Sequence, residues 1–244
     1  MEYILIPIAM KSEAEPFIKK LNNVETKNLF NYEIYIGKYD NLNIIVGISG
    51  IGTINMSGLM HVILTNYKIN FVLNFGTVGG YGNSIHKGDI IVITECVNTN
   101  SFLTKKEEKG KGIKVENIEY VTFVENGEHK FGFYKIDENI MAKLILIFHN
   151  DKNIKYGRIG SGDMWNKEYD KIMYNNEKYE MLCEDMECAA VFQVADKFKI
   201  PFASIKGISN NEILNEEYDF SVMNNLIKAI EKILTTIKKD MGGK

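Results

Sequence analysis

The stretch MECAAVFQVADKFKIPFASIKGISN, residues 186–210, predicts a short helix followed by a buried strand. The helix is indicated by apolar residues that recur behind Glu187 at helical spacing, namely Val191, Val194 and Phe198. The run FASIKGIS that follows is typical of a strand covered on both faces. A carboxylate therefore stands at the start of the helix, and the amide of Asn210 stands at the end of the strand.

The same alternation continues through the rest of the chain. Buried strands are predicted at residues 3–10, 71–80, 88–97 and 156–163, with a hairpin around the YDNLN turn at 31–49. Helices are predicted at residues 12–21, from the SGIGT loop to about residue 66, at 137–150 and at 221–239. In the first helix, Ser12 and Glu15 have the spacing of a capping box. Strands that alternate with helices indicate an α/β sheet with both faces covered.

Length and composition favour one domain, residues 1–244. The chain has 244 residues, of which 45% are hydrophobic, and this is ample for a packed core. Residues 103–130 are rich in lysine, glutamate and glycine and have no sustained apolar face. We expect an insertion of loops and short strands there, which with its flanks covers about residues 98–135.

Charge and residue spacing exclude several classes of partner. A net charge of -3 and a pI near 5.9 give no basic surface for nucleic acid or an anionic membrane. Acidic residues follow the first strand at once, unlike in a signal peptide or a membrane span, so we expect a cytoplasmic protein. Neither the cysteines nor the histidines have the spacing of a metal site, so we expect no metal.

The segments most relevant to function follow the strands, because ligands of α/β sheets bind beyond the carboxyl ends of the strands. Five such segments are polar or rich in glycine: Met10 to Glu13, SGIGT at 49–53, NFGTVGG at 74–80, GSGDMWN at 160–166 and SNNE at 209–212. The two glycine loops could aim backbone N–H groups at one small polar species, although such loops also form plain tight turns.

Glu187 and Trp165 each have two interpretations. A glutamate at the start of a helix interacts favourably with the helix dipole and needs no function. The helical face of Glu187 is otherwise apolar, however, and a buried carboxylate needs a partner. Trp165, the only tryptophan, is either a partly buried packing residue or a stacking plate for a planar base.

Five segments together resemble the 5′-methylthioadenosine/S-adenosylhomocysteine nucleosidases of the nucleoside phosphorylase superfamily: IPIAMKSEAEPF, SGIGTINMSG, NFGTVGGYGNSIHKGDIIV, SGDMWN and DMECAAVFQVADKFKIPFASIKGISN. They run in order from about residue 4 to residue 210. The resemblance implies a central mixed β-sheet flanked by helices, usually in a homodimer. It also implies hydrolysis of the N-glycosidic bond of adenine nucleosides, with no metal or cofactor.

The resemblance implies a role for individual residues. Glu13 would be the general base that activates water, and Glu187 with Met186 would bind the ribose. Trp165 would stack on the purine, and Thr77 would lie beside the ribose and the water. Further site residues implied in this way are Met10, Gly79, Asp185, Lys206 and Ser209, with Asn210 at the purine.

Phosphorylases of the same superfamily surround a bound phosphate with arginines. The only arginine here is Arg158, which lies on a predicted strand far in sequence from both glycine loops. The position before the second glycine loop is Asn74, and the SGIG loop carries no basic residue. Hydrolysis is therefore favoured over phosphorolysis.

Two residues depart from the family pattern. The last strand normally ends in Ser-Asp, and the aspartate gives its proton to N7 of adenine; here the pair is Ser209-Asn210. An amide donates a hydrogen bond but cannot deliver a proton. Lys206 stands where an arginine near the water is usual, and it keeps the charge without the planar fork.

Three functions follow from these residues, in descending order. The first is a purine nucleoside hydrolase that releases adenine and the thioribose from nucleosides of the methylthioadenosine type. The second, favoured by Asn210, is a 6-oxopurine nucleosidase similar to futalosine hydrolases, or a purine nucleoside phosphorylase. The third is a nucleoside-binding protein without catalysis, which the retention of Glu13 and Glu187 opposes.

Overall fold

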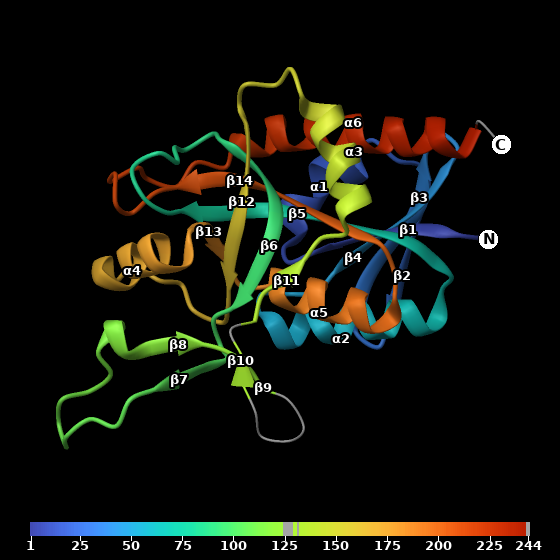
Figure 1. The fold of residues 1–244 in the computed structure, drawn as a ribbon. Helices are drawn as coiled ribbons and strands as arrows, with labels where there is room; N and C mark the ends of the chain where they lie inside the picture. The colour runs from blue at the N-terminus through green and yellow to red at the C-terminus, as the bar shows by residue number, and fades with distance from the viewer. Residues whose placement is uncertain (124–128, 131, 243–244) are drawn as a thin grey trace.

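A computed structural model describes residues 1–123, 129–130 and 132–242. Its central element is a mixed β-sheet (Figure 1). The strands of this sheet are β1 (Tyr3–Ile8), β2 (Asn22–Leu29), β3 (Tyr32–Tyr39), β4 (Leu42–Ile48), β5 (Ile69–Gly80), β6 (Ile90–Asn98), β11 (Tyr134–Lys135), β12 (Ile154–Ser161), β13 (Met181–Asp185) and β14 (Phe202–Asn210).

The order of the strands is β11-β6-β12-β13-β5-β1-β4-β3-β2. The last strand, β14, pairs in parallel with β5 and antiparallel with β6. Strands β6, β12, β13, β5 and β14 therefore close into a ring, while β1 to β4 extend from β5 as an open sheet. The closure brings the ends of β5, β13 and β14 to one place, which is where the candidate site lies.

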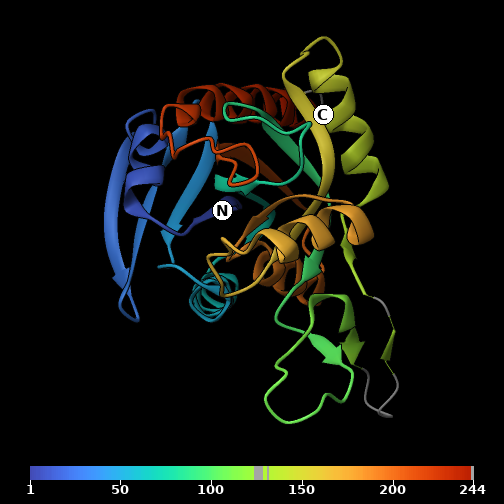
Figure 2. The same cartoon turned by 90° about the vertical axis from the view of Figure 1, so that its left-hand side faces the viewer.

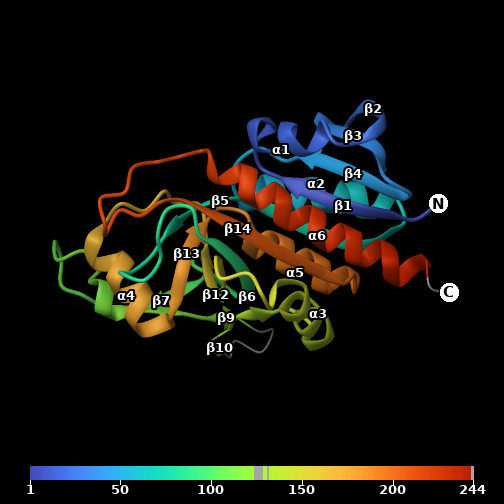
Figure 3. The ribbon, with the colours of Figure 1, turned by 90° about the horizontal axis from the view of Figure 1, so that it is seen from above.

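Helices cover both faces of the sheet (Figures 1 and 3). One face carries α1 (Lys11–Ile18), α3 (Glu138–Phe148) and α6 (Val222–Gly242), and the other carries α2 (Thr53–Asn66) and α5 (Cys188–Phe198). Each helical layer buries its apolar side chains against the sheet, so that two separate cores form. The predicted α/β class with a central mixed sheet and helices on both sides is confirmed.

Most predicted elements are confirmed, with shifted ends. The strand predicted at 3–10 is β1, the hairpin at 31–49 is β3 with β4, and the last helix is α6. The capping box of Ser12 is wrong, because α1 begins one residue earlier than predicted. The N-cap is Met10, which makes no side-chain capping hydrogen bond, and Ser12 lies inside the first turn.

The predicted insertion consists of short elements in the part that the structure describes. It contains β7 (Phe102–Thr104), the 3-10 turn η1 (Val115–Asn117), β8 (Ile118–Tyr120), β9 (Thr122–Phe123) and β10 (His129–Lys130). This segment extends away from the sheet (Figure 2). Helix α4 (Tyr169–Tyr179) follows β12 and contacts η1 in the middle of the insertion. Within the described residues, no helix is both long and apolar enough to cross a membrane.

Candidate active site

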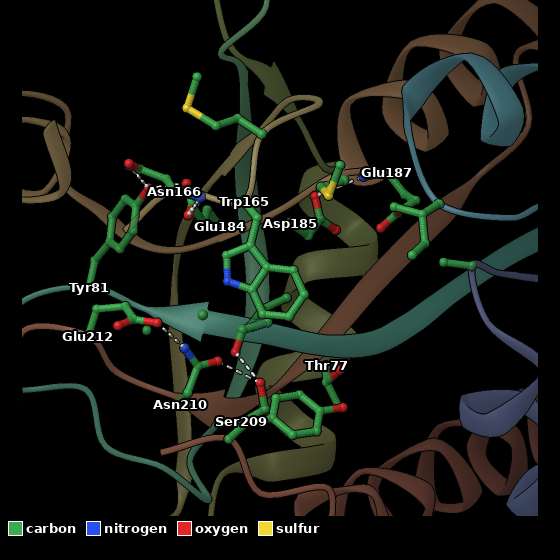
Figure 4. Close-up of a pocket in the computed structure, with 18 of the residues that line it drawn as sticks. Thr77, Tyr81, Trp165, Asn166, Glu184, Asp185, Glu187, Ser209, Asn210 and Glu212 are labelled. Atoms are coloured by element: carbon green, nitrogen blue, oxygen red, sulfur yellow. Dashed lines mark hydrogen bonds between the residues drawn. The ribbon is translucent and has the colours of Figure 1, made fainter. Parts of the chain in front are cut away.

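All five segments predicted from the strand ends meet around one pocket of about 250 Å³. Its wall includes Met10 and Glu13, Ile51, the run from Thr77 to Tyr81, the run from Met164 to Asn166, and Ser209, Asn210 and Glu212. The segment from Glu184 to Glu187 completes the wall. Figure 4 shows that Glu187 lies at one end of this pocket and that Asn210 and Glu212 lie at the other.

Glu13 lies on α1 and is 97% buried, with 3% of its surface exposed. One of its oxygens, Oε1, accepts hydrogen bonds from both the backbone nitrogen and the hydroxyl of Thr77, each at 2.7 Å. The residue before Thr77 is Gly76, where a Cβ would lie 3.4 Å from the same carboxylate. The second oxygen of Glu13 accepts no hydrogen bond from Thr77, and Glu13 lines the pocket.

Glu187 is the N-cap residue of α5, but its carboxylate does not cap that helix. Its Oε1 accepts a hydrogen bond from the backbone nitrogen of Gly52 at 2.8 Å, which supplies the partner that its burial requires. Burial raises the pKa of Glu187 from 4.5 to about 7, the charge of Asp185 adds to this rise, and the Gly52 bond opposes it. The carboxyl group is therefore partly protonated near neutral pH.

The two glycine loops do not present their N–H groups as predicted. The N–H of Gly52 is taken by Glu187, and that of Thr77 is taken by Glu13. Gly50 and Gly52 have φ values of +80° and +107°, a conformation that favours glycine, and this turn directs the Gly52 N–H toward the carboxylate. Each loop therefore holds one of the two site carboxylates, and a ligand would meet the carboxylates.

Asp185 and Lys206 form an ion pair at 2.8 Å, and each side chain is only 3% exposed. The ion pair is not aligned as a hydrogen bond, so Asp185 Oδ2 has no hydrogen-bond partner among the described residues. The other oxygen, Oδ1, accepts hydrogen bonds from the backbone nitrogens of Glu187 and Cys188 at 3.2 and 3.0 Å. Burial lowers the pKa of Lys206, but its anionic neighbours, Asp185 first, outweigh burial and raise it above its ordinary value. Lys206 is not part of the pocket wall, so the structure does not bring it to the predicted place beside the water.

The other end of the pocket is formed by consecutive residues at the end of β14. The Ser209 hydroxyl lies 2.9 Å from Asn210 Oδ1, and the Asn210 amide nitrogen lies 3.4 Å from Glu212 Oε1. Because Oδ1 accepts from Ser209, the amide NH₂ is the group turned toward Glu212 (Figure 4). This end can therefore donate a hydrogen bond to a ligand but holds no proton donor at Asn210.

Trp165 lines the pocket and is 67% exposed. That exposure does not fit the alternative of a partly buried packing residue. In Figure 4 its indole is seen between the Glu187 end and the Asn210 end. Met10, Gly79 and Met186, which the family resemblance implies as site residues, also line the pocket.

Known proteins match this chain along most of its length. A model of the phosphorylase superfamily matches residues 3–239. A Borrelia burgdorferi structure assigned to the 5′-methylthioadenosine/S-adenosylhomocysteine nucleosidases and bound to adenine is 30% identical, with a TM-score of 0.69 and 94% of each chain covered. The chain belongs to the 5′-methylthioadenosine/S-adenosylhomocysteine nucleosidase family of the phosphorylase superfamily.

Other members of this nucleosidase family match over most of their length. The nucleosidase of Buchnera aphidicola subsp. Baizongia pistaciae is 25% identical over 236 residues, which cover 93% of this chain and 85% of that one. A futalosine hydrolase mutant of Helicobacter pylori shares the fold, with 20% identity, a TM-score of 0.77, and 97% and 100% of the two chains covered. Nucleosidases hydrolyse N-glycosidic bonds, and the chain is an enzyme of this class.

In this nucleosidase, Tyr81, Asn166 and Glu184 are among the wall residues that sequence reasoning missed. The hydroxyl of Tyr81 donates to Glu184 Oε2, and the backbone nitrogen of Asn166 donates to Glu184 Oε1 at 3.2 Å. Burial raises the pKa of Glu184 to about 7. The segment MLCED has no apolar alternation in sequence, and its alternation of buried and half-buried residues is recognisable only in the structure.

Arg158 lies outside the pocket wall and is bound by structural partners. Its guanidinium donates to Glu95 at 2.9 and 2.6 Å and lies over the ring of Phe133, 4.8 Å from the ring centroid. Among the described residues that line the pocket there is no lysine or arginine. No cluster of three or more potential metal ligands occurs within the described part of the chain.

Proposed function

We propose that the protein hydrolyses the N-glycosidic bond of purine nucleosides of the 5′-methylthioadenosine and S-adenosylhomocysteine type, releasing adenine and the thioribose. The observation that supports this most strongly is the placement of Glu13 and Glu187 in one pocket that ends in a hydrogen-bond donor at Asn210. Breaking the bond between the sugar and the base develops positive charge on the sugar and negative charge on the base. Carboxylates near the sugar and a donor near the base therefore stabilise the transition state.

In this proposal Glu13 takes a proton from water as the oxygen attacks the anomeric carbon, and the bonding electrons leave with the base. Thr77 holds Glu13 through two hydrogen bonds at 2.7 Å, which fixes the orientation of the base catalyst. Glu187 binds the sugar hydroxyls, with Met186 beside it, and Trp165 stacks on the purine. Asn210 holds N7 by its amide, so the proton that the base takes up comes from another donor.

Hydrolysis rather than phosphorolysis is supported by the charges of the wall. A phosphate dianion needs cationic donors, and the described pocket residues include neither lysine nor arginine. Lys206 does not line the pocket, and it is paired at 2.8 Å with the wall residue Asp185. Water is therefore the nucleophile that this pocket accommodates best.

A 6-oxopurine nucleosidase is a second candidate, and Asn210 favours it. An amide NH₂ can donate to both O6 and N7 of a 6-oxopurine, whereas adenine presents an exocyclic amine at position 6. The test is chromatographic release of free base from methylthioadenosine, S-adenosylhomocysteine, inosine and futalosine. Adenine release supports the first candidate, hypoxanthine release alone supports the second, and binding without release from any of them contradicts both.

We also propose that the enzyme acts as a homodimer in the cytoplasm and needs no metal. The homodimer follows from the family resemblance, and sedimentation equilibrium of the full chain tests it. Activity that survives prolonged treatment with a chelator is the expected result for a reaction carried by carboxylates alone. Loss of activity on chelation, restored by one divalent metal, would contradict this part of the proposal.

A further inference from the structure

Glu184 is a half-buried carboxyl group of the pocket wall that the reaction proposed above does not use. Its two oxygens each accept one hydrogen bond, from the Tyr81 hydroxyl and from the Asn166 backbone nitrogen. A carboxylate oxygen can accept two hydrogen bonds, so each oxygen keeps capacity for a ligand. In Figure 4, Tyr81, Asn166 and Glu184 lie together, at a distance from Glu187.

The strand pairing places Glu184 and Asn210 on either side of the same residue. Gly79 of β5 pairs with Glu184 of β13 and also with Asn210 of β14. The two residues are therefore separated by two strand spacings, on the order of 10 Å between their backbones. Side chains in one row across neighbouring strands point to the same face of the sheet.

The middle of this row is free of side chains because it is a glycine. A Cβ added at Gly79 would lie 4.0 Å from both terminal atoms of the Asn210 amide. On the far side of Glu184, the paired residue on β12 is also a glycine, Gly160. A planar base above Gly79 would thus have Asn210 at one edge and Glu184 at the other.

The two protonation states of a carboxyl group complement different bases. A 6-aminopurine presents an amine donor at position 6 beside an acceptor at N1, whereas a 6-oxopurine presents an acceptor at position 6 beside a donor at N1. A neutral carboxyl group carries one donor and one acceptor, and it matches the first edge. A carboxylate only accepts, and it matches the N1–H of the second.

We propose that Glu184 selects the purine base, pairing as a neutral acid with a 6-aminopurine and as a carboxylate with a 6-oxopurine. This inference rests on the proposed function, which it deepens by naming a specificity-determining residue. Asn210 holds the opposite edge of either base through its amide, and it does not titrate. Any change of the preference with pH is therefore set at Glu184.

The groups around Glu184 allow both states near neutral pH. Burial raises the pKa of Glu184 to about 7; Tyr81, Asn166 and Lys171 lower it, and Asp185 raises it. Burial also raises the pKa values of Tyr81 and Tyr120, so both phenols stay neutral. The 6-oxopurine preference should then increase with pH, because Glu184 loses its proton across this range.

The test compares kcat/KM for 5′-methylthioadenosine and 5′-methylthioinosine, which share one sugar, between about pH 6 and about pH 8, on both sides of the pKa of about 7. In the wild type the ratio of 6-oxo to 6-amino activity should rise with pH, by at most about tenfold per unit. Glutamine has the donor and acceptor of a neutral acid. Glu184→Gln should lose about tenfold or more of 6-oxo activity at the upper pH, and its ratio of 6-oxo to 6-amino activity should not change with pH.

Tyr81→Phe provides a second variant, since it removes a hydrogen bond that lowers the Glu184 pKa. The rise in the ratio should move to higher pH. Glu180→Gln is the matched control, because that side chain is 82% exposed and lies outside the pocket wall. It should behave as the wild type.

Two results would overturn this inference if the wild type still releases base. One is a wild-type ratio of 6-oxo to 6-amino activity that does not change with pH. The other is the same ratio, at each pH, in Glu184→Gln as in the wild type. Absence of release from both nucleosides by the wild type would overturn the proposed function itself. If circular dichroism shows that Glu184→Gln is unfolded, Tyr81→Phe provides the test. A ratio of 6-oxo to 6-amino activity that rises at the same pH in Tyr81→Phe as in the wild type would then overturn the inference.

Discussion

Glu13 accepts two hydrogen bonds from a single residue, Thr77, through its backbone nitrogen and its hydroxyl, each at 2.7 Å. Helix α1 and the end of β5 are thereby joined at the reacting end of the pocket. The hydrogen bond from the backbone nitrogen forms whatever side chain stands at position 77, whereas the second bond requires the hydroxyl. The contribution of the hydroxyl can therefore be separated from that of the backbone.

Thr77→Val should lower kcat by about tenfold with little change in KM, since a hydrogen bond to a charged group contributes about 1.5–3 kcal/mol. The backbone donor remains, so activity is reduced and not abolished. Thr77→Ser keeps the hydroxyl and should retain most of the wild-type kcat. Steady-state kinetics on the three proteins checks the expectation, and equal kcat values for all three would contradict it.

Asn210→Asp should raise kcat on 5′-methylthioadenosine by about tenfold or more, because a positioned general acid contributes about 10²–10⁴-fold. The new carboxyl group would lie beside Glu212, whose Oε1 is 3.4 Å from the present amide nitrogen, and like charge helps it to keep a proton. Activity on 5′-methylthioinosine should fall. Asn215→Asp, on an exposed residue of the same loop, is the control. A lower rate of adenine release would show that Asn210 is already the better residue here.

Trp165→Ala should weaken nucleoside binding by about two- to tenfold, since an aromatic stack contributes about 0.5–1.5 kcal/mol. Trp165→Phe keeps a stacking plate and should bind nearly as the wild type does. Trp165 is the only tryptophan and is 67% exposed, so its emission reports directly on the pocket. Titration with adenine should change this emission. An unaltered spectrum at saturating adenine would rule out the stack.

Glu187→Gln should be more stable than the wild type at high pH. The folded-state pKa of about 7 exceeds the ordinary 4.5, so the native state binds more protons than the unfolded state between these values. Wild-type stability should fall as pH rises through that window, by up to about 3 kcal/mol. Glutamine has no charge to desolvate and keeps an acceptor for the Gly52 N–H. Urea unfolding should show a higher free energy of unfolding for Glu187→Gln than for the wild type at about pH 8, and no such difference at about pH 4. An equal difference at both pH values would contradict this prediction.

The sequence was sufficient to predict that five polar or glycine-rich segments lie around one pocket. The carboxyl ends of parallel strands share one edge of a sheet, so five segments far apart in the chain could be assigned to one pocket. Glu187 stood out as an acid on an otherwise apolar helical face, and Glu13 stood out because it follows the first strand. Strand β1 was predictable because its apolar run is continuous, as a strand buried on both faces requires.

The sequence was not sufficient to predict how the site is held together. The partner of Glu187 is a backbone N–H that lies 135 residues away, and nothing in a side-chain pattern indicates it. Strand β2 is almost entirely exposed and has no apolar alternation, so it was missed. Lys206 looked available for a ligand because its partner, Asp185, is only recognisable once β13 and β14 are placed in the ring.

The most direct test of hydrolysis in this pocket is release of free base from 5′-methylthioadenosine in phosphate-free buffer by wild type, Glu13→Gln and Glu15→Gln. Glu13 is buried in the pocket wall, whereas Glu15 lies on the exposed side of the same helix. The wild type and Glu15→Gln should release adenine and a reducing sugar at equal rates, and Glu13→Gln should be about 10²–10⁴-fold slower. Turnover that requires phosphate, or that persists in Glu13→Gln, would contradict the proposed mechanism.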